Sequence, residues 1–306
     1  MNSQDVTFES DGIRLAGTFT PAAEPVAAAV LITGSGRLNR DSDARLPGGL
    51  TLRAGITSAI ASALAEAHVS TLRFDKRGIG ASGGDYWSTG MPQRLADARA
   101  ALAWLAGQAP GLPLLAIGHS EGACHAASLA ADGNVAGAVL VSGIAQPGGA
   151  VLAWQTRQIA ATMPLISRAI LRLMRTDVVS AQQRNEARIL ASTQDVMRMQ
   201  GTKVAARWVR DFVRYDPAPV LARITVPVLA VTGGHDLQVP PADVETMGTL
   251  VRGPFTGRVV GDLSHLLRPD PRRAGLRDYR RQVREPVSPD VLGLITGWVC
   301  CHWGPR

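Results

Sequence analysis

The residues best suited to nucleophilic chemistry lie in the run 118–122, G-H-S-E-G, near the middle of the chain. The apolar residues 114–117 before it predict a strand buried on both faces, and the Ala-rich run 123–131 after it predicts a helix. The glycines two positions either side of Ser120 permit a turn that has no room for Cβ atoms there. Such a turn holds the hydroxyl at the positive end of the following helix, where a developing oxyanion is stabilised. We therefore predict that Ser120 is a catalytic nucleophile, the alternative being a serine in an ordinary strand–helix turn.

A serine hydroxyl needs a base to take its proton and a group that orients this base. After a strand–turn–helix serine motif, the acid comes next in the chain and the histidine last. Among the six histidines, His265 lies in a loop just beyond the final predicted strand, so we expect it to be the base. His119 lies within the motif itself, and its side chain is expected to point away from Ser120. The alternative for His265 is a surface or capping histidine.

The acid should follow the strand before the final one, which is predicted at 226–231. Asp236, in the segment T-G-G-H-D-L-Q-V-P, has this position, and we expect it to accept a hydrogen bond from His265 and to stabilise the imidazolium. The alternative for Asp236 is a turn-forming or capping aspartate. Asp262 is the second choice of acid because it is close to His265 in the sequence.

An oxyanion hole requires two backbone N–H groups. One is expected from Glu121, the residue after the nucleophile, and the other from the G-S-G segment 34–36, where glycines allow a close approach of the backbone. We favour Ser35 for the second donor, with Gly36 as the alternative. Gly36 and Glu121 are also candidate substrate contacts, and the Glu121 carboxylate could serve as a salt-bridge partner or as a substrate selector.

The elements that must position these residues alternate between strands and helices. The pattern predicts a hairpin around Asp11-Gly12, and then strands and helices in turn up to residue 146. The expected strands are 5–9, 13–19, 26–33, 70–74, 114–117 and 135–142, and the expected helices are 55–67, 92–107 and 123–131, with a long loop at 37–49. This alternation is typical of an α/β fold with a doubly wound, mostly parallel sheet.

The alternation stops in the segment 147–215, where we expect no strand but helices at 151–161, 163–175, 180–198 and 202–213. A strand at 226–231, a helix at 241–252, a strand at 256–260 and a helix at 289–301 follow. We therefore predict a core formed by residues 1–146 and 216–306, with 147–215 as a helical cap inserted before the strand that carries the acid.

Composition narrows the class of protein. The chain of 306 residues is 46% hydrophobic and 19% charged, which is typical of a globular protein. The net charge of +7 comes almost entirely from arginines spread along the chain, and only 5% of residues are aromatic, so we expect no nucleic-acid partner. The densest basic stretch, 268–284, is expected to be a solvated surface segment.

Other features are expected to be structural. No apolar run is long enough for a membrane span, and the N-terminus lacks the pattern of a signal peptide, so we expect a cytoplasmic location. Cys124 is expected to be a small core residue, and Cys300 and Cys301 lack partner ligands at metal spacing. We expect no metal and no other cofactor.

Taken together, these motifs resemble the α/β-hydrolase superfamily, in particular its serine esterase and acyl-hydrolase branch. The resemblance rests on G-H-S-E-G at 118–122, G-G-H-D at 233–236, Ser264-His265 and the segment D-K-R-G-I-G-A-S at 75–82, which is similar to a glycine-rich turn common in that superfamily. The oxyanion segment departs from many relatives because it is T-G-S-G followed by Arg40-Asp41, as in a bacterial subgroup.

The resemblance implies cleavage of a small-molecule carboxylic ester through an acyl-enzyme. Alternatives on the same residues are an acyl-CoA thioesterase and a proline-type aminopeptidase. A non-catalytic ligand receptor on this scaffold is the alternative from another class. Neither the substrate nor the oligomeric state follows from the sequence.

Overall fold

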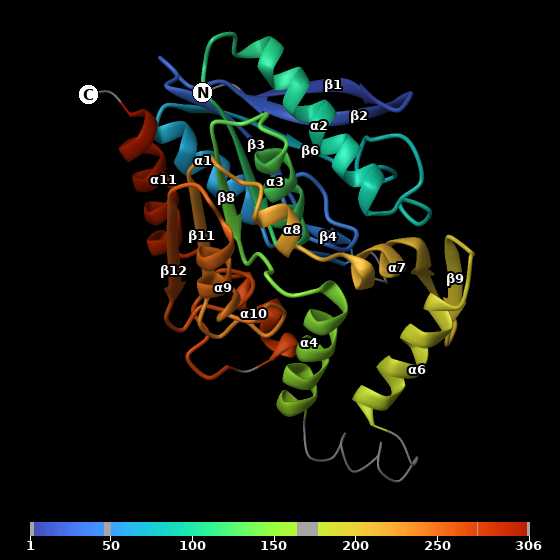
Figure 1. The fold of residues 1–306 in the computed structure, drawn as a ribbon. Helices are drawn as coiled ribbons and strands as arrows, with labels where there is room; N and C mark the ends of the chain where they lie inside the picture. The colour runs from blue at the N-terminus through green and yellow to red at the C-terminus, as the bar shows by residue number, and fades with distance from the viewer. Residues whose placement is uncertain (1–2, 46–49, 164–176, 274, 305–306) are drawn as a thin grey trace.

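The computed structural model describes residues 3–45, 50–163, 177–273 and 275–304. An eight-stranded sheet forms its centre, with the strand order β1-β2-β6-β3-β7-β8-β11-β12 (Figure 1). Its strands are β1 (Gln4–Ser10), β2 (Ile13–Thr20), β3 (Ala27–Ile32), β6 (Val69–Phe74), β7 (Leu114–His119), β8 (Gly137–Val141), β11 (Val228–Gly233) and β12 (Phe255–Val260). The predicted α/β architecture is therefore confirmed.

The first two strands form the predicted hairpin. Asp11 and Gly12 both have positive φ, 49° and 73°, as a two-residue hairpin turn requires. β2 pairs antiparallel with β6, and every later pairing in the sheet is parallel. As a result, six neighbouring strands present their carboxyl ends at the same edge of the sheet.

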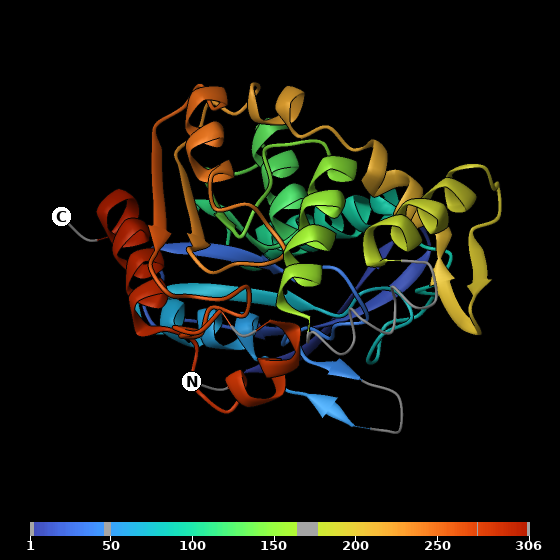
Figure 2. The ribbon, with the colours of Figure 1, turned by 90° about the horizontal axis from the view of Figure 1, so that it is seen from below.

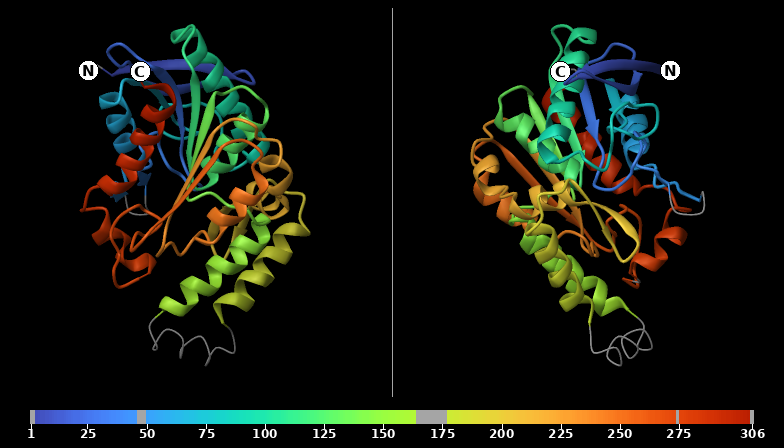
Figure 3. Two further views of the ribbon diagram at one scale, coloured as in Figure 1. Left: turned by 60° about the vertical axis from the view of Figure 1, so that its left-hand side comes forward. Right: turned by 90° about the vertical axis from the view of Figure 1, so that its right-hand side faces the viewer.

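Helices cover both faces of this sheet (Figure 3). One face carries α2 (Met91–Gln108), α3 (Glu121–Ala131), α8 (Ala218–Leu221) and α9 (Asp243–Leu250), and the other carries α1 (Ile56–Glu66) and α11 (Pro289–Trp303). Successive side chains of each strand point to opposite faces of the sheet. In β3, Val30 packs toward α2 and α3, whereas Leu31 packs toward α1. Such strands are apolar throughout, which explains why they could be recognised in the sequence.

The segment between β8 and β11 projects from one end of the core (Figure 2). It contains α4 (Gly148–Thr162), α6 (Val178–Leu190), β9 (Val196–Met199), β10 (Thr202–Ala205) and α7 (Ala206–Arg214). α4 packs against both α6 and α7, and α7 also contacts α2 of the core. The predicted helix at 163–175 lies almost entirely outside the described residues.

The prediction that this segment holds no strand is wrong. β9 and β10 form an antiparallel hairpin, in which Gln200 and Gly201 make the turn with φ of 49° and 79°. The hairpin replaces parts of the predicted helices 180–198 and 202–213. In the structure, Met197, Met199 and Val204 of this hairpin pack in one cluster with Ile189 and Ala206.

Two other expectations need correction. The predicted long loop 37–49 contains a short strand, β4 (Ala44–Arg45), which pairs with β5 (Thr51–Leu52) just after the loop. The basic stretch 268–284 is not uniformly a solvated surface, because the Arg268 guanidinium is buried and donates to the backbone carbonyls of Ala54, Leu266 and Glu285. η2 (Leu276–Asp278) and α10 (Tyr279–Gln282) follow within the same stretch.

The helices that the structure describes include none that is both long enough and apolar enough to span a membrane.

Candidate active site

Ser120 occupies a sharp turn between β7 and α3. Its φ of 56° and ψ of −121° are unfavourable for a residue with a side chain, at a cost of about 1–3 kcal/mol. A Cβ on Gly118 would overlap the carbonyl of Gly122, and a Cβ on Gly122 would overlap the carbonyl of Ile32. The two glycines therefore let α3 pack closely against β7 and β3, and this packing holds the strained conformation of Ser120.

Asp236 and His265 follow the ends of β11 and β12 and meet beside Ser120. His265 Nδ1 lies 2.7 Å from Asp236 Oδ2, and both side chains are buried. The other carboxylate oxygen of Asp236 accepts hydrogen bonds from the backbone N–H groups of Gln238, at 2.7 Å, and Val239, at 3.0 Å. The carboxylate is thus held at both oxygens.

The charge state of this pair follows from its partners. Burial raises the pKa of the Asp236 carboxyl, but the neighbouring His265 and the two backbone N–H groups outweigh burial, so its pKa lies below the ordinary value. Because an ionised carboxylate only accepts hydrogen bonds, His265 Nδ1 carries the proton. The lone pair of the neutral ring is then on Nε2, which is the atom that could take a proton from a serine hydroxyl.

The loop after β11, which carries Asp236, lies directly against the loop after β12, which carries His265. A Cβ on Gly233 would overlap the carbonyl of Leu263, and one on Gly234 would overlap the carbonyl of Gly261. The backbone N–H of His235 also donates to the carbonyl of Leu263, at 2.9 Å. The glycines before Asp236 therefore allow the direct contact between the loops that carry Asp236 and His265.

His119 forms a hydrogen bond with the backbone of His265. Its Nε2 lies 3.0 Å from the His265 carbonyl oxygen, and the two rings are tilted with centroids 4.8 Å apart. Burial lowers the pKa of His119 to about 3, so the ring is neutral and Nε2 is the donor. The second-choice acid, Asp262, is exposed and lies 3.7 Å from His235 Nε2. Its carboxylate therefore lies next to a different histidine from His265.

The candidate oxyanion segment packs against Ser120. A Cβ on Gly34 would lie 3.1 Å from Ser120 Cβ, so the backbone of the segment approaches the nucleophile closely. Lys76 Nζ donates to the carbonyl of Gly34 and, at 3.0 Å, to the carbonyl of Gly36. Glu121, the other candidate donor, is the first residue of α3, so its N–H belongs to the first turn, where backbone donors lack helical partners.

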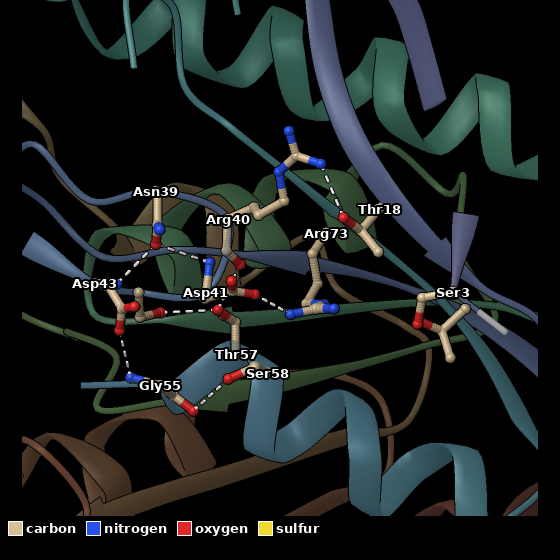
Figure 4. A network of polar contacts seen from close by, with 12 residues as sticks. Ser3, Thr18, Asn39, Arg40, Asp41, Asp43, Gly55, Thr57, Ser58 and Arg73 are labelled. Carbon is tan, nitrogen blue, oxygen red and sulfur yellow. Dashed lines mark hydrogen bonds and ion pairs between the residues drawn. The ribbon is translucent and has the colours of Figure 1, made fainter. Parts of the chain in front are cut away.

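Polar contacts fix the chain that follows the oxyanion segment (Figure 4). Asn39 Oδ1 accepts from the N–H groups of Asp41 and Asp43, and the Arg40 carbonyl accepts from Thr57. Arg73 pairs with Asp41. This network ties the segment after β3 to β6 and α1.

The glycine-rich turn after β6 contributes to the same network. Asp75 accepts from the backbone N–H of Arg40, at 2.8 Å, and from its guanidinium. A Cβ on Gly80 would overlap the Asp75 carboxylate, so glycine is required at that position. The turn that the resemblance implied at 75–82 is present, but its contacts with the oxyanion segment were not anticipated. The sequence signal that could have indicated this contact is the presence of both Arg40-Asp41 and the D-K-R-G segment at 75–78.

Two cavities meet at Ser120. The first, of about 230 Å³, lies between the projecting segment and the core, and seven of its twelve lining residues are apolar. It is lined by Ser35, Ser120, Glu121, Cys124, Ile144, Val151, Leu152, Gln155, Trp208, Phe212, Gln238 and Val239. The second, of about 160 Å³, contains His265, His119 and Tyr279 in its wall, together with Ser35, Ser120 and Gln238. Gly36, the alternative oxyanion donor, is not among the lining residues of either cavity.

Gln238 lines both cavities, a position that sequence reasoning did not identify. Its side-chain amide donates to Tyr279 Oη at 2.9 Å, while its backbone N–H donates to Asp236. Cys124, expected to be a small core residue, is buried and also forms part of the first cavity's wall.

The Glu121 carboxylate is paired within the protein. Arg94 Nη1 lies 3.0 Å and 2.8 Å from its two oxygens, and His125 Nε2 lies 3.3 Å from one of them. Burial raises the pKa of Glu121, but Arg94 and His125 outweigh burial and bring it well below the ordinary value. Glu121 is therefore a charged salt-bridge partner, one of the two roles that the sequence left open.

At the C-terminus, Cys300 and Cys301 are exposed on α11. Across the part of the chain that the structure describes, no group of three or more histidine, cysteine or acidic side chains is arranged to hold a metal ion.

Solved structures of esterases resemble this fold over nearly the whole chain. Est1E from Butyrivibrio proteoclasticus, solved with ferulic acid bound, is 18% identical with a TM-score of 0.60 and 96% coverage of both chains. The α/β-hydrolase GrgF from Penicillium sp. sh18 is 17% identical with a TM-score of 0.65 and full coverage of both. The Pyrococcus furiosus esterase Pf2001 is 15% identical with a TM-score of 0.61, covering 99% of this chain and 91% of its own.

A comparison with curated protein sequences finds no match. A family model described as "Serine aminopeptidase, S33" matches residues 47–254, which include Ser120 and Asp236 but neither His265 nor the oxyanion segment. This match covers more than half of the chain, and the fold agrees with it. The protein is thus a hydrolase of the α/β-hydrolase fold and belongs to the serine aminopeptidase S33 family.

Proposed function

We propose that the protein is a serine hydrolase that cleaves carboxylic esters through an acyl-enzyme on Ser120. The observation that carries the proposal is the buried 2.7 Å hydrogen bond between His265 Nδ1 and Asp236, beside a strained serine in a shared cavity. This bond leaves His265 Nε2 as the base. We also propose that residues 147–215 act as a cap over the core segments 1–146 and 216–306.

In the proposed reaction, Ser120 Oγ attacks the ester carbonyl while His265 Nε2 takes the hydroxyl proton. The backbone N–H groups of Ser35 and Glu121 bind the resulting oxyanion. His265 then returns the proton to the leaving alkoxide as the carbon–oxygen bond breaks. Water attacks the acyl-enzyme in the same way, with His265 as base and then acid, and the carboxylic acid leaves.

The two cavities support an ester with two distinct parts. The leaving group must lie on the side of His265, which protonates it, and the 160 Å³ cavity has His265 in its wall. The acyl group then occupies the 230 Å³ cavity, where Ile144, Leu152 and Phe212 provide an apolar surface. An uncharged acyl group with an apolar part fits this mixed wall.

The family description favours an aminopeptidase as the second candidate. Such an enzyme needs a carboxylate that is free to bind the amino group of the substrate. Among the described residues that line the 230 Å³ cavity, Glu121 is the one carboxylate, and Arg94 already neutralises it. This pairing is why we place ester cleavage first.

The first test is intact-mass analysis after treatment with a fluorophosphonate, for wild type and Ser120→Ala. We expect a single adduct on wild type and none on the variant. Absence of an adduct on folded wild type would exclude the serine-hydrolase proposal. Rates on p-nitrophenyl esters, matching thioesters and aminoacyl p-nitroanilides then separate the three substrate classes, and faster turnover of the anilides would establish the aminopeptidase instead.

A further inference from the structure

The Lys76 side chain is buried, although lysine rarely is. Moving an ammonium group out of water is unfavourable unless strong acceptors replace the water. Among the described residues, the hydrogen-bond acceptors for Lys76 Nζ are the backbone carbonyls of Gly34 and Gly36. The lysine that follows β6 is therefore directed at the segment that follows β3.

The first of these carbonyls belongs to the peptide group that joins Gly34 to Ser35. A trans peptide is planar, and its C=O and N–H point in opposite directions. With Lys76 on the carbonyl side, the Ser35 N–H points away from Lys76. Ser35 lines both cavities next to Ser120, whereas Lys76 lines neither. Lys76 thus binds the C=O of the peptide group whose N–H, on the opposite side, is the expected oxyanion donor.

A cation on a carbonyl oxygen changes the opposite end of the peptide. Hydrogen bonds to charged groups are about twice as strong as neutral ones, and hydrogen bonds in series polarise one another in a buried environment. The ammonium group therefore makes the Ser35 N–H a stronger donor. Because it also holds the Gly36 carbonyl, it fixes the orientation of the glycine-containing turn before the substrate arrives.

We propose that Lys76 is a positioning residue of the oxyanion hole, holding and polarising the Gly34–Ser35 peptide so that the Ser35 N–H stabilises the developing oxyanion. This inference rests on the proposed function, since it assumes that Ser120 is the nucleophile and that Ser35 is a donor. Lys76 acts through the peptide and does not touch the substrate.

The charged groups that act on Lys76 are Glu121 and Arg94. Burial lowers the pKa of Lys76 to about 7, Glu121 acts against this decrease, and Arg94 adds to it. A negative charge that develops next to the Ser35 N–H would favour the ammonium form. Lys76 and an oxyanion on Ser120 should therefore stabilise each other. This coupling can be measured either as the effect of Lys76 on oxyanion binding or as the effect of the oxyanion on the pKa of Lys76.

The test compares Lys76→Met, Lys76→Gln and a matched control, Lys203→Met, which removes the chain's other lysine from an exposed position of the β9–β10 hairpin. For p-nitrophenyl esters we expect Lys76→Met to lower kcat about 10- to 100-fold with KM within about threefold, less than the loss of a whole oxyanion donor. Lys76→Gln, which retains one neutral donor, should fall in between, and Lys203→Met should match wild type.

A second readout separates oxyanion stabilisation from general structural damage. A trifluoromethyl ketone forms an oxyanion on the serine, whereas the corresponding secondary alcohol does not. In Lys76→Met, the inhibition constant of the ketone should rise by the same factor as kcat falls, while that of the alcohol should change by less than about threefold. A kcat within threefold of wild type, or equal weakening of ketone and alcohol, would overturn the proposal.

A third measurement uses only wild type and applies even if both variants fail to fold. In protein labelled with [13Cε]lysine, two lysine signals are expected, and formation of the ketone adduct should raise the pKa of Lys76 from about 7 to about 8 or above. An unchanged pKa would overturn the inference. If fluorophosphonate labels Ser120 but these effects are absent, only the role of Lys76 fails. If Ser120 is not labelled, the proposed function fails and this inference fails with it.

Discussion

At the scale of single residues, the hydrogen bond between Asp236 and His265 decides which ring nitrogen is available as a base. We expect Asp236→Asn to lower kcat about 10³- to 10⁴-fold with little change in KM, because the amide N–H would bind the opposite tautomer and leave the proton on Nε2. Steady-state kinetics on a p-nitrophenyl ester measure this. The matched control is Asp262→Asn, whose exposed carboxylate contacts His235, and its kcat should stay within about twofold of wild type. A larger loss in Asp262→Asn than in Asp236→Asn would transfer the acid role to Asp262.

The pKa of Lys76 makes a prediction about stability. Its folded value of about 7 lies below its ordinary value of 10.5, so between these two pH values the unfolded chain binds more protons than the folded chain. The free energy of unfolding should therefore gain from this group as pH rises from about 7 to about 10. Urea unfolding of wild type and Lys76→Met at several pH values tests this. We expect the difference to shift in favour of wild type with rising pH, and a constant difference would show that the pKa is not lowered.

At the scale of elements, the crossing of α3 over β3 depends on the absence of a side chain at Gly122. A methyl group there would overlap the carbonyl of Ile32 and lie 2.9 Å from that of Thr33. We expect Gly122→Ala to lower the free energy of unfolding by about 1–3 kcal/mol. Activity should fall as well, because the displaced carbonyls directly precede the oxyanion segment.

The control for this substitution is Gly107→Ala near the end of α2, where an added Cβ meets no atom within 4 Å. That variant should be more stable than wild type by about 0.5–1 kcal/mol, because alanine loses less backbone entropy in a helix. Urea unfolding followed by circular dichroism measures both variants. Equal effects of the two substitutions would show that the close packing of α3 on β3 does not limit stability.

At the scale of the whole molecule, residues of the projecting segment and of the core together line the proposed acyl cavity. Leu152 on α4 forms part of its wall and is only partly buried, so replacing it should change the cavity more than the stability. We expect Leu152→Ala to shift the preferred p-nitrophenyl ester to longer acyl chains and Leu152→Phe to shift it to shorter ones. Gln183→Ala, at an exposed position of α6, serves as the control and should leave the chain-length profile unchanged. A profile that stays the same in both Leu152 variants would exclude this cavity as the acyl site.

The core fold was predictable because its signals are local. Buried parallel strands are apolar throughout, glycine marks the turns, and helices alternate with strands, so the sheet and its order of elements follow from the sequence. The hairpin of β9 and β10 was missed because its two strands have only four residues each, too few for a clear period-2 pattern. Arg268 was misplaced because a single charged residue in a basic stretch gives no local sign of burial.

For the candidate site, the sequence by itself determined the residue types and their order: a serine between two glycines, an aspartate after a Gly-Gly pair and a histidine in the last loop. Chain order also led us to expect the pairing of Asp236 with His265, which the structure contains. Only the tertiary structure decided the other partners: it pairs Glu121 with Arg94 and places Lys76 behind the Gly34–Ser35 peptide. These contacts join segments that are 27 to 42 residues apart. Spacing in the sequence does not encode such distances, because they depend on how strands from different parts of the chain are ordered in the sheet.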